Sequence, residues 1–174
     1  MTRPYQPFLL RVLHSLNGLL VLGALVTGFW VYDNYDGRFG RIALPALTDS
    51  QGLHGTIGLT FLLFFPIFAI YSFYAGQNRL IQPDSTANLR RIPHPIGWLS
   101  LHRIINTALL IASVFALISG RLMKEEWLPN GDLDHLAYYL HLFSWLMLTL
   151  GLFVHILMAA RVGGLSLILS IIDV

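Results

Sequence analysis

The sequence predicts an all-α integral membrane protein, a four-helix bundle with its N- and C-termini in the cytoplasm. Hydrophobic residues make up 55% of the 174 residues and charged residues only 11%, well below the roughly 25% that is usual in a soluble domain. The apolar residues gather in four stretches, each close to the roughly 20 residues that a helix needs to cross a bilayer. These stretches lie at about 9–31, 53–75, 99–122 and 136–160. Little chain lies outside them, so we expect one domain, 1–174.

The first stretch follows Met1-Thr2-Arg3 and could pass for a signal peptide. It is too long for the apolar core of one, it contains His14 and Asn17, and no convincing small-residue cleavage site follows it. We therefore interpret it as the first transmembrane helix. Aromatic residues lie near the ends of the stretches, as in the aromatic belts of membrane proteins: Trp30, Tyr32, Tyr71, Tyr74, Trp98 and Tyr138.

The charges give the helices a direction, because positive residues gather on the cytoplasmic side of a membrane protein. The N-terminal segment, the 76–98 connection with the following helix start, and the C-terminus share one side. That side holds Arg3, Arg11, Arg79, Arg90, Arg91, Arg103 and Arg161 against Asp84 and Asp173. The other side holds Arg38, Arg41, Arg121 and Lys124 against Asp33, Asp36, Asp49, Glu125, Glu126, Asp132 and Asp134. Both termini are therefore predicted to be cytoplasmic.

Composition also excludes several classes of function. The chain has no cysteine, which rules out disulfides, iron–sulfur clusters and thiolate-bound metals. Nucleic acid is not an expected partner, because the positive residues lie at membrane edges rather than in one basic patch.

The second half of the chain weakly resembles the first, which we interpret as an ancient duplication of a helix pair. Arg11 through Thr27-Gly28 aligns with Arg103 through Ser119-Gly120. In this alignment His14 of the first helix falls on Asn106 of the third. Leu53-His54 of the second helix resembles Leu140-His141 of the fourth, and His155 then falls on Phe68. A duplication would produce two equivalent pockets, of which only some kept their ligands.

Histidines inside the apolar stretches are the main candidates for function, because ionisable groups in a membrane are costly and usually face the bundle interior. His141 and His155 are 14 residues apart on one predicted helix, so they share a face and are separated by about 21 Å along the axis. One metal ion cannot bridge that distance, but two sites can. By depth, His54 matches His141 on the outer side and His14 matches His155 on the cytoplasmic side.

Two histidine pairs stacked across the membrane predict two haems, each iron bound by His14 and His155 or by His54 and His141, because two imidazoles can occupy both axial positions of a haem. Glycine or alanine follows three of these histidines by one turn and would let a flat macrocycle approach: Gly18, Gly58 and Ala159. Trp145 follows His141 at the same offset. The alternative is that the small residues and the histidines only pack and join helices, in a membrane subunit without redox function.

Three other histidines have different expected roles. His102 lies at about the depth of His14 and could replace it as a ligand, contact a haem propionate or line a quinone pocket; a pocket role or a simple interface role is favoured over ligation. His94, in Pro93-His94-Pro95, is expected at the surface, and His135 is expected to be solvated.

The four-helix pattern with His14, Leu53-His54 and His141-x13-His155 resembles the bacterial cytochrome b561 family, and is similar to the cytochrome b subunits of formate dehydrogenase and nickel–iron hydrogenase. The resemblance covers essentially the whole chain. It implies two b haems with the pairing given above, and quinone chemistry near one membrane face. The family includes stand-alone members, among them a quinone-reducing superoxide oxidase, and the 32–51 connection could cover the outer haem or dock a partner.

We therefore expect transmembrane electron transfer in a bacterial inner membrane, with quinone as substrate and an outer donor or acceptor such as a redox protein. The possible activity is that of a quinone-linked oxidoreductase, and the alternative is that the chain is an anchor subunit of a larger complex. The protein could also form a homodimer. Asn17, His102 and Asn106 are candidates for the quinone pocket, and Arg11 and Arg103 for haem propionates, for which charge-assisted hydrogen bonds are strong. A transporter is disfavoured, because the histidines avoid the membrane midplane where transporters place their sites.

Overall fold

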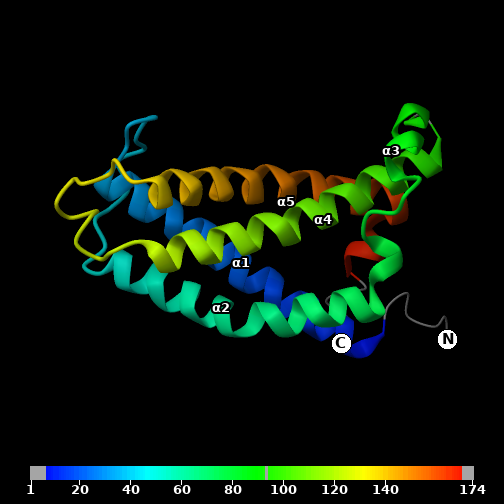
Figure 1. Ribbon diagram of the computed structural model, residues 1–174, viewed down its shortest axis with the longest axis horizontal. Helices are drawn as coiled ribbons and strands as arrows, with labels where there is room; N and C mark the ends of the chain where they lie inside the picture. The colour runs from blue at the N-terminus through cyan, green and yellow to red at the C-terminus, as the bar shows by residue number, and fades with distance from the viewer. Residues whose placement is uncertain (1–6, 93, 170–174) are drawn as a thin grey trace.

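The computed structural model describes residues 7–92 and 94–169; Arg3, Pro93 and Asp173, which entered the sequence argument, lie outside them. Four long helices run along the longest axis of the molecule (Figure 1). They are α1 (Phe8–Tyr35), α2 (Ser50–Ala75), α4 (Pro95–Leu122) and α5 (Leu136–Leu169). Each is long and apolar enough to cross a membrane, and the described residues contain no strand. The predicted all-α membrane bundle is confirmed.

The helices extend beyond the predicted stretches, because hydropathy detects only the part that crosses the hydrocarbon. α2 begins at Ser50, where the Asp49 side chain accepts a hydrogen bond of 2.9 Å from the Gly52 N–H and caps the helix. α4 begins at Pro95, a residue suited to the first helical position because it has no N–H to leave unpaired. α5 contains a break at Gly164, whose φ of 66° only glycine adopts readily.

The bundle consists of two helical hairpins, α1 with α2 and α4 with α5, which pack more extensively within each pair than between pairs. Short helices η1 (Gln77–Arg79), α3 (Ser85–Asn88) and η2 (Leu89–Arg91) connect the hairpins at one end. The start of α1 and the end of α5 lie at that same end (Figure 1). We name it the inner end, after the predicted orientation, and the opposite end the outer end.

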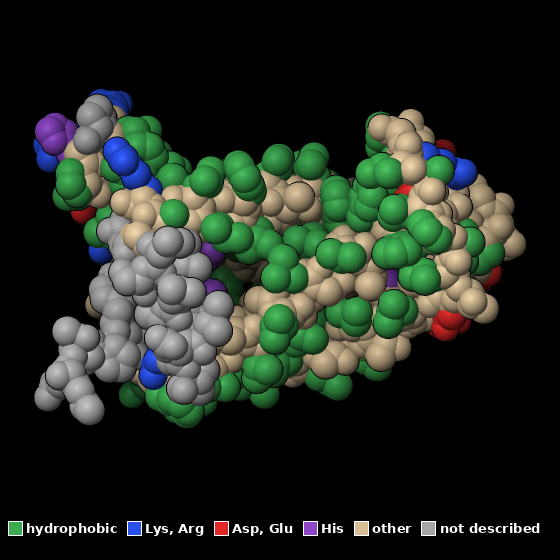
Figure 2. Space-filling view, turned by 180° about the vertical axis from the view of Figure 1, so that it is seen from behind, with side chains coloured by type: hydrophobic (Ala, Val, Ile, Leu, Met, Phe, Trp, Pro, Cys, Tyr) green, Lys and Arg blue, Asp and Glu red, His purple; other side chains and the backbone are tan. Residues whose placement is uncertain are grey.

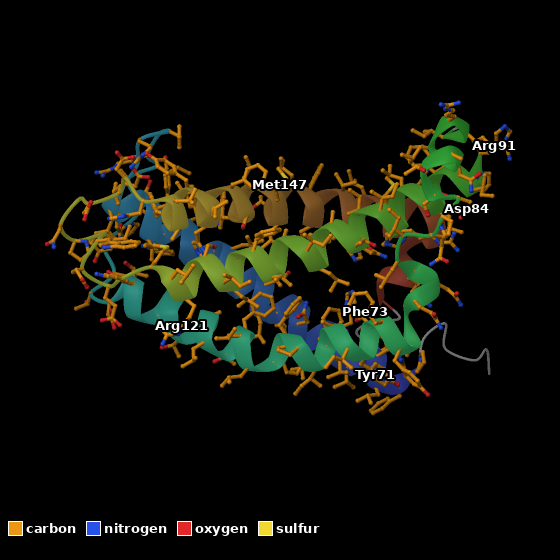
Figure 3. The ribbon with its side chains drawn as sticks, viewed as in Figure 1. Tyr71, Phe73, Asp84, Arg91, Arg121 and Met147 are labelled. Atoms are coloured by element: carbon orange, nitrogen blue, oxygen red, sulfur yellow. The ribbon has the colours of Figure 1, made fainter. Side chains whose placement is uncertain are left out.

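The surface is apolar along the middle and charged at the ends, as a lipid environment requires. Leu19, Leu63 and Ile70 are examples of large side chains that are more than 60% exposed. Figure 2 shows this green band, with charged side chains at both ends: mostly basic ones at one end, and acidic ones together with basic ones at the other. In Figure 3, Asp84 and Arg91 lie on the projecting inner segment, whereas Arg121 lies toward the outer end.

Several hydroxyl side chains inside the helices satisfy their hydrogen bonds locally. Thr60, Ser113 and Ser144 each donate to the carbonyl oxygen four residues earlier, at 2.7–2.9 Å. Such bonds pair a hydroxyl where no water is available. A core of aromatic and aliphatic side chains, including Leu13, Val21 and Phe65, fills the space between the two ends.

Candidate functional site

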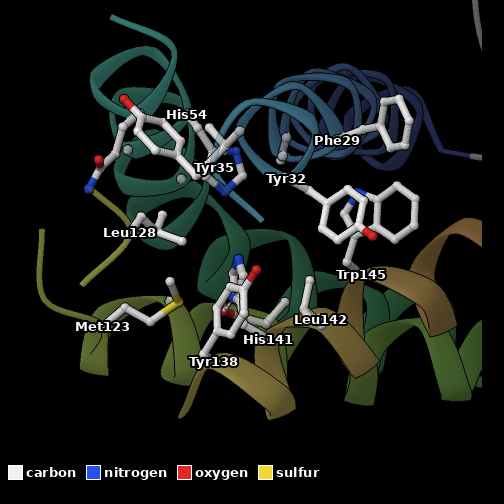
Figure 4. A pocket seen from close by; sticks show the side chains of 18 of the residues that line it. Phe29, Tyr32, Tyr35, His54, Met123, Leu128, Tyr138, His141, Leu142 and Trp145 are labelled. Carbon is white, nitrogen blue, oxygen red and sulfur yellow. Dashed lines mark hydrogen bonds between the residues drawn. The ribbon is translucent and has the colours of Figure 1, made fainter. Parts of the chain in front are cut away.

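The outer histidine pair joins the two hairpins. His54 projects from α2 and His141 from α5, and their ring centroids are 5.9 Å apart with the planes at 75°. Figure 4 shows both rings entering the same space between the helices. The structure therefore brings together the two histidines that depth alone had matched.

The inner histidine pair has the same ring separation. His14 on α1 and His155 on α5 have centroids 5.9 Å apart, with nearly parallel planes at 26°. On its other side His14 meets Phe68 of α2 edge to face, at 6.0 Å. This pair also crosses from one hairpin to the other, so α5 contributes to both sites.

The spacing of both pairs fits two axial ligands of one iron. Metal–imidazole bonds are about 2 Å long and a ring centroid lies roughly 1 Å further out, so two ligands on opposite sides have centroids about 6 Å apart. Both observed separations, 5.9 Å, match that value. Packing alone would not require the same separation at two places.

The ring nitrogens of the paired histidines are also arranged as in metal ligands, which commonly donate their second N–H to a nearby acceptor. Nδ1 of His141 lies 3.0 Å from the Ala116 carbonyl oxygen, which can only accept. Nδ1 of His155 lies 2.8 Å from Oδ1 of Asn106, whose Nδ2 donates to the Arg79 carbonyl oxygen at 3.0 Å. That second bond fixes which amide atom faces His155. In both rings Nδ1 therefore carries the proton, and Nε2 has a free lone pair.

A cavity of about 1740 Å³ surrounds the outer pair. Its volume exceeds the roughly 300–1,000 Å³ typical of ligand pockets, so it has room for a macrocycle. Its wall is mostly apolar and includes Gly58, together with Phe39 and Gly40 of the 36–49 connection. The connection therefore forms part of the wall of the outer cavity.

The connection is held in place from α1. The Asp33 carboxylate accepts from the backbone N–H groups of Ile42 at 2.6 Å and Leu44 at 2.8 Å. The Asp36 carboxylate pairs with Arg38 at 2.8 Å and accepts from the Tyr138 hydroxyl at 2.6 Å. The hydrogen bond to Asp36 raises the pKa of the Arg38 guanidinium.

Two of the four basic side chains at the outer end already have partners: Arg38 forms an ion pair with Asp36, and Arg41 donates to the Asp36 carbonyl oxygen at 3.1 Å. Arg121 and Lys124 instead line the cavity. They are the cationic side chains best placed to meet an anionic group there.

Two glycines that sequence reasoning did not select approach the outer histidines most closely. A Cβ atom on Gly28 would lie 3.1 Å from Cε1 of His54, and one on Gly120 would lie 3.0 Å from Cε1 of His141. By contrast, nothing lies within 4 Å of a Cβ built on Gly18 or Gly58. The repeat Thr27-Gly28 and Ser119-Gly120 was the signal that could have identified the first two.

The inner pair has further polar neighbours. The His102 ring lies 5.1 Å from that of His155, tilted by 53°. Its Nε2 and the Oδ1 of Asn17 are buried and have no hydrogen-bond partner among the described residues. Arg103 donates from Nε to the Asn78 carbonyl oxygen at 2.9 Å, and Arg11 is buried with its guanidinium 5.9 Å from the Phe8 ring centroid.

The two remaining histidines lie apart from both pairs. His94 precedes α4 and is exposed, as expected. His135 is not simply solvated: it is half-buried, stacks on Trp127 at 3.7 Å between ring centroids, and lies 3.1 Å from an Asp132 oxygen. Sequence gave no sign of this stack, because it depends on how the 123–135 connection folds back.

Comparison with known proteins identifies the family. The family model of prokaryotic cytochrome b561 matches residues 5–172, nearly the whole chain. No curated protein and no solved structure gives a match. The four membrane helices and the histidine pairs agree with this result. The chain therefore belongs to the prokaryotic cytochrome b561 family, whose members are membrane electron-transfer proteins with b-type haem.

Proposed function

We propose that this protein carries electrons across a bacterial inner membrane by means of two b-type haems, between the quinone pool and a second donor or acceptor. The observation that carries the proposal is the pair of cross-hairpin histidine contacts, both 5.9 Å between ring centroids and at opposite ends of the bundle. Bound haem supplies reversible one-electron chemistry at its iron. The four paired histidines would hold the two irons through their imidazoles, and the surrounding residues would fix the orientation of these rings and keep water away.

The unpaired polar atoms at the inner end favour a quinone site there. Buried polar atoms nearly always have a hydrogen-bond partner, yet Nε2 of His102 and Oδ1 of Asn17 have none among the described residues. A quinone carbonyl accepts hydrogen bonds and a quinol hydroxyl donates them, so these two atoms offer complementary groups. Asn106 serves instead as the acceptor for His155. Arg11 and Arg103 remain the candidates for haem propionates at this end.

The outer partner is best sought among proteins. Glu125, Glu126 and Asp132 are exposed on the outer connection, and such a surface suits a basic redox protein better than a small anion. Copurification distinguishes a stand-alone oxidoreductase, such as a superoxide oxidase, from the anchor subunit of a larger complex. A stable iron–sulfur partner would identify the subunit. A homodimer would appear in the same experiment as a single-component complex of twice the mass.

Haem titration of the histidine variants tests the proposal. The pyridine haemochrome assay should find two haems per chain in the wild type, and one after His14→Ala, His155→Ala, His54→Ala or His141→Ala. His94→Ala is the matched control, because His94 is exposed and belongs to neither pair. Wild-type protein without a Soret band would refute the proposal in favour of helix-packing histidines.

The variant His102→Ala addresses the remaining choice of inner ligand. We expect it to keep both haems, because the His14 ring has the separation from His155 that shared ligation requires, 5.9 Å, whereas the His102 ring lies closer, at 5.1 Å. Loss of a haem on His102→Ala with retention on His14→Ala would assign the inner iron to His102.

A further inference from the structure

The two hairpins carry the same local arrangement around the outer histidines. In the first hairpin, Thr27 Oγ1 of α1 lies 3.0 Å from Nδ1 of His54 on α2. In the second, Ser119 Oγ of α4 lies 3.2 Å from Nδ1 of His141 on α5. Thr27 and Ser119 occupy equivalent positions in the internal repeat, and each precedes the glycine that its histidine approaches.

Each hydroxyl is available to its histidine only as an acceptor. Thr27 Oγ1 lies 2.7 Å from the Gly23 carbonyl oxygen, and Ser119 Oγ lies 2.6 Å from that of Phe115. A carbonyl oxygen can only accept, so the single hydroxyl proton is used within the helix. The facing Nδ1 atom must then supply the proton of its own contact, which leaves Nε2 of the ring as the free base.

On the side of α1, the His54 ring packs closely beside Gly28, the residue that follows Thr27. A Cβ on Gly28 would lie 3.1 Å from the His54 ring and 3.4 Å from Trp145. Trp145 is itself fixed, because its Nε1 donates to the Leu25 carbonyl oxygen at 3.0 Å. Thr27 and Ser119 are both buried, 9% and 2% exposed, so solvent has little access to either hydroxyl.

We propose that Thr27 and Ser119 are positioning residues for the outer haem ligands: they hold His54 and His141 in the Nδ1–H tautomer and strengthen electron donation from Nε2. This inference rests on the proposed function, in which these histidines bind the outer iron. A hydrogen bond accepted from a metal-bound imidazole raises the basicity of the ligand, which favours ferric over ferrous iron and lowers the midpoint potential of the haem.

The two hydroxyls should contribute unequally to holding their histidines. His141 has a second acceptor, the Ala116 carbonyl oxygen at 3.0 Å, whereas Thr27 is the partner of Nδ1 of His54 in the described structure. Removal of the Thr27 hydroxyl should therefore have the larger effect.

Redox titration of the purified holoprotein, followed by optical and electron paramagnetic resonance spectra, tests the inference with Thr27→Val, Thr27→Ser and Ser119→Ala. We expect Thr27→Val to raise the midpoint potential of one haem, through a loss of about tenfold in the preference for ferric iron, or about 59 mV for a one-electron couple. Thr27→Ser should restore the wild-type value, and Ser119→Ala should give a smaller rise. The haem absent from His54→Ala identifies the outer one.

An unchanged outer potential in Thr27→Val with both haems bound would overturn the inference. So would an equal shift in Thr27→Ser, since the effect would then come from shape and not from the hydroxyl. A wild type with fewer than two haems, or a His54→Ala variant that loses none, would instead refute the proposed function.

Discussion

Replacing Gly58 tests which of two roles this glycine has: leaving space for haem, or allowing helices to pack closely. Apart from the neighbouring residues and backbone of its own helix, no protein atom lies within 4 Å of a Cβ placed on Gly58, although the residue lines the outer cavity. Without haem, Gly58→Ala should therefore meet no steric obstacle and should stabilise α2 by about 1 kcal/mol, the difference in helix propensity between glycine and alanine. With haem, a larger side chain at this position occupies the space that the macrocycle needs.

The two effects have opposite signs, so they can be measured apart. Gly58→Leu should lower the haem content from two per chain to one by the pyridine haemochrome assay. Thermal unfolding of apoprotein produced under haem limitation should show that neither Gly58→Ala nor Gly58→Leu is destabilised. Gly18→Leu should remove the inner haem by the same logic, since the Cβ position of Gly18 is equally open.

Ala108→Leu serves as the matched control, because Ala108 is exposed on α4 and enlargement there should leave both haems bound. Two haems retained in both Gly58→Leu and Gly18→Leu would refute the reasoning. The glycines would then have no role in haem approach.

Three further predictions follow from the inner site and from the junction between hairpins. Asn106→Leu should weaken binding of the inner haem alone, by about 10–100-fold in affinity, which is typical for the loss of a hydrogen bond to a metal ligand. Equal loss of both haems in a haem titration would instead indicate general misfolding. His102→Ala should slow the reduction of the haems by a short-chain quinol in stopped-flow measurements while both Soret bands persist, and an unchanged rate would move the quinone site away from His102. Haem should stabilise the contact between the hairpins. Free haem at 100 times its dissociation constant adds about 2.7 kcal/mol to the free energy of unfolding, which is measurable as a rise in the midpoint of thermal unfolding. No rise would mean that the hairpins associate independently of the cofactor.

Sequence reasoning predicted the features that depend on one helix at a time. The membrane spans followed from hydropathy, and the depth of each histidine followed from helical rise. It was less successful with helix ends, because the Asp49 cap of α2 and the first residue of α4, Pro95, both lie outside the apolar stretches.

Depth predicted which histidines meet, but the close contacts between neighbouring helices were not predictable. Gly28 and Gly120 matter because the neighbouring helix brings an imidazole within about 3 Å of them, and nothing in either helix alone records that distance. The internal repeat aligned both glycines and their preceding hydroxyls, but it did not say what they contact. The ligand roles of the histidines remain predictions, which the variants above test.

The position of α5 has a consequence for how the protein is made. Both histidine pairs include a residue of this helix, His141 at the outer end and His155 at the inner end. Chains are synthesised from the N-terminus, so the ribosome completes α1, α2 and α4 before either pair can form. If these pairs bind haem as we propose, haem insertion at both sites would have to wait for the last helix, and a chain that stops before α5 would lack both complete histidine pairs.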